Sequence, residues 1–220
     1  MKRSIERLAV PALLAALLTA CSSGPTPRQV AQAKQAVAPV VALSMVATAK
    51  TAGSEGADMR FHAALQLMTD RKTAEAQKAF NSLSRDFPAL SGPLTDLGIL
   101  YARGKQRDSA IASFAKAVAA NPDNAVALNW CGALYRETGD FQRAEQFYLK
   151  ALSVKPDYAA AALNLGILYE VSMHRPQEAL VQYRRYQQLS GKDDLIVTAW
   201  IKDIENSDAK VAVNRVGDRS

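Results

Sequence analysis

Residues that commonly carry out chemistry are scarce in this sequence. Its 220 residues include two histidines, His62 and His174, and two cysteines, Cys21 and Cys131. The histidines lie far apart, and neither stands at a metal-ligand spacing. No serine elbow, phosphate-binding loop or paired-carboxylate motif is present either. The sequence therefore predicts no enzyme, no catalytic residue, no cofactor, no metal site and no small-molecule substrate.

A strong excess of charge of one sign is also missing. The chain has 27 Lys and Arg residues against 21 Asp and Glu residues, for a formal net charge of +6. It contains no run of basic residues and no alternation of basic and aromatic residues, which are the usual signs of a nucleic-acid surface. We therefore expect no nucleic-acid partner.

Long apolar runs are limited to one, from Leu8 to Ala20, behind the basic start Met1 to Arg7. With 13 residues it is too short to span a bilayer comfortably and has the length of a signal-peptide hydrophobic region. It ends in Leu-Thr-Ala-Cys, which resembles the lipobox of bacterial lipoproteins. The resemblance implies cleavage before Cys21 and acylation of that cysteine. An ordinary secretory signal with a chance cysteine is the alternative.

The residue after the cysteine bears on localisation. In the lipoprotein sorting rule that this motif resembles, an aspartate at that position retains the protein in the inner membrane, whereas the chain has Ser22. We therefore expect an outer-membrane protein, anchored by lipid on Cys21 and facing the periplasm. Each buried methylene of an acyl chain contributes about 0.8 kcal/mol to such an anchor.

Composition divides the chain into four predicted parts. Residues 1–20 form the signal peptide, and residues 21–56 contain the lipidated cysteine, a short polar tether and a weakly helical stalk. Residues 57–206 form a repeat domain with a capping helix, and residues 207–220 form a disordered tail. Within the second part, residues 28–50 are ambiguous: they fit one or two short helices, a stalk or an additional docking surface.

A period of 34 residues organises the repeat domain. Proline, glycine and tyrosine each recur with this period, and alanine does so with one inserted residue before its third position. The recurring residues are Pro88, Pro122 and Pro156; Gly98, Gly132 and Gly166; Tyr101, Tyr135 and Tyr169; and Ala110, Ala144 and Ala179. A period of this length is typical of stacked helix pairs, each of which has an apolar side that only a neighbouring pair can bury.

This pattern resembles the tetratricopeptide repeat (TPR), over about residues 57–191. The resemblance implies an all-α fold, a right-handed α-solenoid of about four TPR helix pairs. A further helix at 195–205, with an apolar stripe of Leu195, Ala199, Trp200 and Ile204, is expected to cap the last pair. The sequence departs from the repeat pattern at Cys131, Ala162, Tyr186 and Gly191. Cys131 occupies a core position, where a buried structural thiol is expected.

The repeated residues also have physical roles that do not depend on the family. A glycine inside a helix costs about 1 kcal/mol relative to alanine, so close packing must return that cost. We expect Gly98 to face Ala110, and Gly132 to face Ala144, where the two helices of a pair meet. The prolines end helices, and Asp123 or Asn124 and, in the next repeat, Asp157 can cap the helices that follow.

The resemblance further implies a concave groove lined by the first helix of each pair, with Asp96 and Trp130 among its residues. The groove residues that we single out for partner binding are Thr95, Ile99, Arg103, Asn129, Ala133, Arg136, Leu163, Asn164, Ile167 and Glu170. The amide of Asn164 can hold the backbone of an extended peptide. The alternative is that Asn129 and Asn164 satisfy only neighbouring backbone or water.

Taken together, these features predict a membrane-tethered adaptor that binds a protein of the cell envelope. The layout resembles pilotin-type lipoproteins of type IV and tight-adherence pili, which implies a role in assembling a pilus, a secretin or a related system. One alternative is an adaptor for cell-wall hydrolases, and another is a structural lipoprotein of the envelope that associates with itself.

Overall fold

The computed structural model describes residues 54–191 and 194–217. The predicted signal peptide, Cys21, the tether and most of the stalk lie outside the described residues. By backbone contacts the chain divides into two compact units, residues 1–36 and residues 37–220, and all described residues belong to the second unit. None of the described helices combines the length and the apolar character that crossing a bilayer requires.

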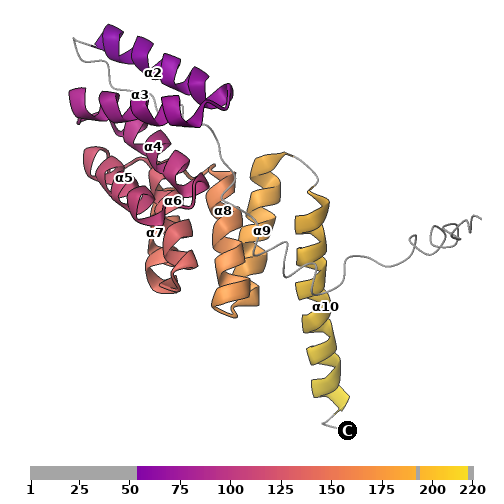
Figure 1. Ribbon diagram of the computed structural model, residues 1–220. Coiled ribbons are helices and arrows are strands. Elements are labelled where there is room, and N and C mark those ends of the chain that lie inside the picture. Colours follow the sequence, from indigo (N-terminus) through magenta and orange to yellow (C-terminus); the bar gives the residue numbers. More distant parts are fainter. Residues whose placement is uncertain (1–53, 192–193, 218–220) are drawn as a thin grey trace, which may run out of the picture. The chain divides into compact units, whose positions relative to one another are not determined.

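The described residues form four antiparallel helix pairs followed by one more helix, and they contain no strand (Figure 1). The pairs are α2 (Ser54–Thr69) with α3 (Thr73–Asp86), α4 (Ser91–Arg103) with α5 (Arg107–Ala120), α6 (Ala125–Glu137) with α7 (Phe141–Val154), and α8 (Ala159–Ile167) with α9 (Pro176–Ser190). The last helix is α10 (Leu195–Gly217). The predicted all-α repeat array is thus confirmed.

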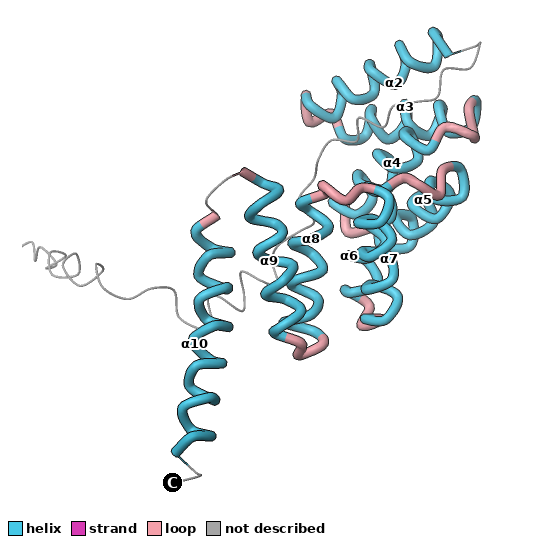
Figure 2. Tube along the Cα trace, turned by 180° about the vertical axis from the view of Figure 1, so that it is seen from behind, coloured by secondary structure: helices cyan, strands magenta, loops and turns pink. Residues whose placement is uncertain are grey.

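Successive pairs stack on one another through a repeated contact. The second helix of each pair packs against the first helix of the next pair, as α3 does with α4, α5 with α6 and α7 with α8 (Figure 2). Buried apolar residues of neighbouring pairs therefore form shared hydrophobic clusters. In one of them Phe114 of α5 stacks on Trp130 of α6, with ring centroids 5.7 Å apart.

The glycines that recur at one repeat position each make a close contact inside their helix pair. The residue that they contact differs from our expectation. A Cβ on Gly98 would lie 2.7 Å from the Phe114 ring, and one on Gly132 would lie 2.7 Å from the Tyr148 ring. Each glycine therefore lies against an aromatic ring of the second helix, one turn beyond the alanine that we expected. The alanines Ala110 and Ala144 are fully buried in the same pairs.

Side chains cap the N-termini of α6 and α7. Asn124 caps α6 by accepting a hydrogen bond from the backbone N–H of Ala127 at 3.0 Å, as predicted. Asp140 caps α7 by accepting from the N–H of Arg143. The predicted cap Asp157 is wrong, because Tyr158 is the N-cap residue of α8 and makes no side-chain capping bond.

The inserted residue of the last pair is absorbed inside a helix. After Ile167 the chain continues as a π-helix, η1 (Leu168–Ser172), which packs against α8 and α9. A π-helix accommodates one extra residue in a helical segment without breaking it. The turn that follows contains His174 in the left-handed region, with φ of 53°.

Helix α10 packs against α9, as a cap of the array requires (Figure 1). Its buried stripe consists of Val197, Trp200, Ile201 and Ile204. The prediction was wrong for Leu195, which is 79% exposed because it precedes the stripe in the first turn of the helix. The helix also continues to Gly217, beyond residue 206, where the sequence pattern predicts that the repeat domain ends.

Candidate protein-binding face

The structure brings most of the predicted groove residues together on the first helices α4, α6 and α8. Seven of them are buried, and we call these seven the first-helix face: Thr95, Ile99, Asn129, Ala133, Leu163, Asn164 and Ile167. The three charged residues lie at the C-terminal ends of these helices or just beyond them. Arg103 is exposed, whereas Arg136 and Glu170 are half-buried.

A buried hydrogen bond joins α4 to the start of α6. The side-chain amide of Asn124 donates to the Thr95 hydroxyl at 2.8 Å, while the Thr95 hydroxyl donates to the backbone carbonyl of Ser91. Asn124 therefore performs two tasks, since its side-chain oxygen also caps α6. Sequence reasoning assigned it only the cap, because nothing in the 34-residue pattern indicates which helix its amide group faces.

A second buried hydrogen bond joins α6 to α8. The amide Nδ2 of Asn164 donates to Oδ1 of Asn129 at 3.0 Å, and neither side chain is exposed. This contact uses one donor and one acceptor of the two amides. Among the described residues, the Nδ2 of Asn129 and the Oδ1 of Asn164 are buried and make no hydrogen bond of ordinary length. The neighbour of the Asn129 amide is the Tyr158 hydroxyl, whose pKa burial raises and the amide lowers to a smaller extent. Within the described part of the chain the face thus holds a donor and an acceptor without such a bond, the same pair of groups that a peptide backbone presents.

A hydrogen bond joins the half-buried Glu170 to the second helix of its pair. The Tyr183 hydroxyl of α9 donates to Oε2 of Glu170 at 2.8 Å. Burial, together with the Glu170 carboxylate, raises the pKa of Tyr183 far above its usual range. Burial also raises the pKa of Tyr158, at the start of α8, to about 12. Both phenols therefore remain neutral donors at physiological pH.

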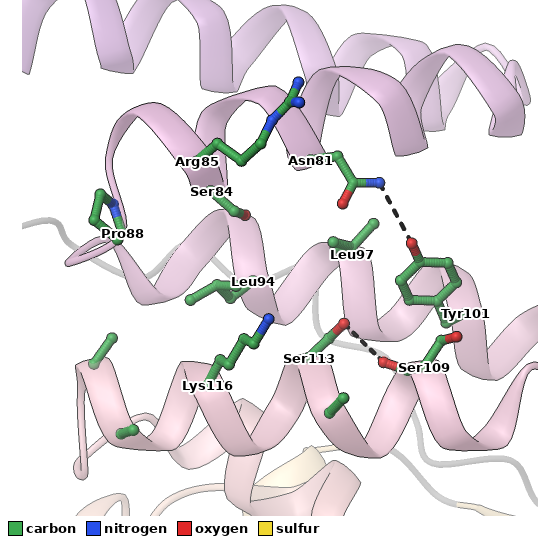
Figure 3. A pocket seen from close by; sticks show the side chains of 13 residues that line it. Asn81, Ser84, Arg85, Pro88, Leu94, Leu97, Tyr101, Ser109, Ser113 and Lys116 are labelled. Atoms are coloured by element: carbon green, nitrogen blue, oxygen red, sulfur yellow. Dashed lines mark hydrogen bonds between the residues drawn. The ribbon is translucent and has the colours of Figure 1, made fainter.

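Two pockets lie away from the first-helix face. The larger, of about 700 Å³, lies between α3, α4 and α5 and is bordered by Arg85 and Lys116 (Figure 3). In it the Asn81 amide donates to the Tyr101 hydroxyl at 3.3 Å. The smaller, of about 230 Å³, is apolar and reaches Cys131. Neither contains a second group placed for catalysis.

Cys131 is buried and free, as its core position in the repeat predicts. Burial raises the pKa of its thiol to about 12. A thiol is a nucleophile only as the thiolate, which is nearly absent at neutral pH when the pKa is this high. Cys131 therefore fills space in the hydrophobic core that α4, α5 and α6 share.

A comparison with known protein families agrees with this architecture of helix pairs, a 34-residue period and glycine–aromatic contacts. The tetratricopeptide-repeat family model matches residues 101–165. Those residues of this chain therefore match the tetratricopeptide repeat. The fold is that of a scaffold for protein–protein interaction, and TPR domains bind protein partners.

Curated relatives match parts of the array. The probable UDP-N-acetylglucosamine–peptide N-acetylglucosaminyltransferase SPINDLY of Petunia hybrida is 32% identical over 114 residues, which are 52% of this chain and 12% of that protein. The peroxisomal targeting signal receptor of Candida albicans is 33% identical over 92 residues, 42% of this chain and 15% of that protein. This chain thus spans only a small share of the length of either relative.

Solved structures share the fold over more of the chain. PilF of Pseudomonas aeruginosa superposes with a TM-score of 0.64 at 20% identity, covering 74% of this chain and 73% of that chain. A MamA structure from Desulfovibrio magneticus has a TM-score of 0.57 at 16% identity, covering 77% of this chain and 100% of that chain. At these identities the likeness concerns the fold alone.

Proposed function

We propose that this protein is an envelope adaptor, anchored in the outer membrane by lipid on Cys21, that holds an extended protein segment on its first-helix face. The partner belongs to an assembly machine of the envelope, such as a pilus or secretin system. The observation that carries the binding role is the buried pair Asn129 and Asn164, in which one amide donor and one acceptor are left without a hydrogen bond by the described residues.

The chemistry of the face favours a peptide backbone over a charged ligand. Leaving a buried polar group without a partner costs about 1–3 kcal/mol, so these two amide atoms favour an occupant that can satisfy both. An extended chain does so with one N–H and one C=O. The apolar neighbours Ile99, Ala133 and Ile167 favour small or apolar side chains in that segment.

The lipobox supports the anchoring part of the proposal. An anchor at the membrane surface raises the local concentration of adaptor around an envelope partner, so that a face of modest affinity is sufficient. Replacing Cys21 by Ser should move the protein from the membrane fraction to the soluble fraction, while Cys131→Ser should leave it in place. A membrane-bound Cys21→Ser protein would contradict the anchor.

Crosslinking in intact cells tests the binding part. A photo-reactive residue at Arg136, at the rim of the face, should capture an envelope protein, and mass spectrometry then identifies it. Pilus or secretin subunits support the proposal, cell-wall hydrolases favour a hydrolase adaptor, and captured copies of this chain favour a self-associating lipoprotein. The double variant Asn129→Ala, Asn164→Ala should abolish capture. The matched variant Asn81→Ala, outside the face, should not.

A further inference from the structure

The two pockets described above occupy the same place in successive repeats. The larger lies where the second helices α3 and α5 flank α4, and the smaller lies where α5 and α7 flank α6. One period of 34 residues relates the residues that line them. Tyr101 lines the first and Tyr135 the second, and Leu97 corresponds to Cys131 in the same way. The two pockets are therefore one groove of the repeat, seen twice.

A single side-chain position decides how open this groove is. In the smaller pocket the position holds Phe147 of α7, whose ring stacks on Tyr135 with the centroids 5.3 Å apart. One period earlier stands Ser113 of α5, whose hydroxyl donates to the backbone carbonyl of Ser109 at 2.8 Å. The ring that fills the groove in one repeat is thus missing in the other, where the cavity measures about 700 Å³ instead of about 230 Å³.

The open groove has an apolar floor and a positive charge on each side. Leu94 and Leu97 of α4 lie between α3 and α5, with Arg85 on α3 and Lys116 on α5 (Figure 3). Both cations are exposed, and no aspartate or glutamate is among the described residues that line the pocket. The lining of the smaller pocket, by contrast, contains no charged residue of the described part of the chain.

Neither cation forms an ion pair with another described residue. Asp86 is next to Arg85 in sequence, but its carboxylate lies 2.6 Å from the guanidinium of Arg60. Two cations beside one groove attract an anionic occupant, and the apolar floor adds a requirement for apolar side chains.

We propose that the groove between α3 and α5 binds an acidic segment of a partner protein. Apolar side chains of the segment contact Leu94 and Leu97, and its carboxylates face Arg85 and Lys116. The lining residues of α5 lie within residues 109–120, about 16–17 Å along the helix axis. About five residues of extended chain cover that length.

The shape and chemistry of the groove favour a protein segment over a small anion. A single phosphate or carboxylate would leave the apolar floor uncovered, whereas an extended segment covers it. Asn81 of α3, whose amide donates to the Tyr101 hydroxyl at 3.3 Å, also lines the groove. Its side-chain oxygen can accept a hydrogen bond from a backbone N–H of the segment.

The groove is separate from the first-helix face. None of the residues that line it belongs to that face, and its walls are formed by second helices. The proposal therefore does not depend on the envelope adaptor function. It gives the repeat array a second binding site, so that one protein can hold two segments at once.

Peptide binding to the full-length protein in detergent tests the charge preference. The probe is a short fluorescent peptide of alternating leucine and glutamate, and the matched probe has lysine in place of each glutamate. Fluorescence anisotropy should show saturable binding of the acidic peptide only. Arg85→Glu with Lys116→Glu should weaken this binding by about tenfold or more.

A matched pair of substitutions controls for net charge. Lys150→Glu with Lys202→Glu makes the same change at exposed positions outside the groove and should leave the affinity within about twofold. Failure of the acidic peptide to bind, or an equal loss of affinity in both charge-reversed proteins, would overturn the proposal.

Filling the groove provides the second measurement. Ser113→Phe places in α5 the ring that Phe147 supplies in α7, and it should weaken binding of the acidic peptide by about tenfold or more without lowering the Tm. Ser153→Phe, at an exposed position of α7 outside both pockets, should leave the affinity unchanged. Full retention of the peptide by a folded Ser113→Phe protein would contradict the groove.

Two further outcomes locate the binding. The double variant Asn129→Ala, Asn164→Ala should keep its affinity for the acidic peptide. Loss of affinity there would assign the peptide to the first-helix face and refute the groove, whereas loss of envelope partners alone would concern only the adaptor function. Phosphatidylglycerol vesicles that displace the peptide and still bind the Ser113→Phe protein would indicate a charged surface and would also refute the groove.

Discussion

The ring of Tyr148 lies so close to Gly132 that a Cβ on the glycine would stand 2.7 Å from the ring atom Cδ1. Tyr148 is fully buried. The same relationship holds between Gly166 and Tyr183, at 2.6 Å. A repeated glycine thus sets the distance between the two helices of a pair, and an aromatic residue fills the space that the missing side chain leaves.

Gly132→Ala should destabilise the protein. Overpacking of this kind costs about 1–3 kcal/mol, and the better helix propensity of alanine returns up to about 1 kcal/mol. Thermal unfolding followed by circular dichroism should show a Tm lower by several degrees. Gly56→Ala in α2 is the control, because among the described residues no side chain and no other helix lies within 4 Å of the added Cβ, and its Tm should stay the same or rise. Equal effects of the two substitutions would contradict the close contact.

Trp200→Ala should detach the capping helix α10. The indole is 1% exposed and lies 5.4 Å from the Tyr183 ring, centroid to centroid. Removing a buried aromatic side chain costs about 3–5 kcal/mol and here exposes the apolar side of the last pair. We expect a lower midpoint in urea and concentration-dependent aggregation. Leu195→Ala, on the same helix but exposed, should stay within about 0.5 kcal/mol of the unaltered protein. A soluble Trp200→Ala variant of unchanged midpoint would argue against the cap.

Arg175→Ala should destabilise the protein more at neutral than at acid pH. The Arg175 guanidinium lies 2.8 Å from Glu145 and 2.9 Å from Glu178, and its hydrogen bond lowers the pKa of the Glu178 carboxyl. A lowered carboxyl pKa stabilises the folded state above the unfolded pKa, and this contribution disappears as the pH falls through the lowered value. The Tm difference between variant and unaltered protein should therefore shrink from pH 7 to pH 2.

Part of the Tm difference caused by Arg175→Ala should remain at acid pH, and a second variant serves as the control. Arg175 also lies 4.5 Å from the centre of the Tyr169 ring, an interaction that acid does not remove, so part of the difference should persist. Arg107→Ala removes a longer ion pair, 3.6 Å from Glu137, and should give a small difference at both pH values. A constant difference for Arg175→Ala would show that the carboxylates do not contribute.

Cys131 should resist alkylation until the protein unfolds. In a Cys21→Ser variant it is the sole thiol, and burial raises its pKa from 9.0 to about 12. The thiolate fraction at pH 8 is then roughly a thousandfold lower than in the unfolded chain. Iodoacetamide labelling followed by mass spectrometry should be correspondingly slow in buffer and fast in denaturant. The same shift lowers stability as the pH rises from about 9 towards 12. Rapid labelling of the folded protein would contradict this burial.

The number and order of the helices could be predicted because they depend on local chemistry that recurs. The local signals are the prolines after the second helices of the first three pairs, the capping residue Asn124, and glycines that recur at one phase. The π-helix at 168–172 could be anticipated only as an inserted residue, since an insertion can be absorbed in a turn or in a helix with little difference in sequence. The exposure of Leu195 depends on the exact rotation of α10 against α9, which a stripe of apolar residues fixes only within one turn.

The sequence by itself determined the period, the four helix pairs and the positions that the repeat places on its first helices, because each follows from spacing along one chain. Only the tertiary structure decided which groups meet across helices. It placed Gly132 against Tyr148, directed the Asn124 amide to Thr95, and paired the Asn164 amide with Asn129. These contacts depend on rotation and distance between helices that are far apart in sequence, and packing sets both.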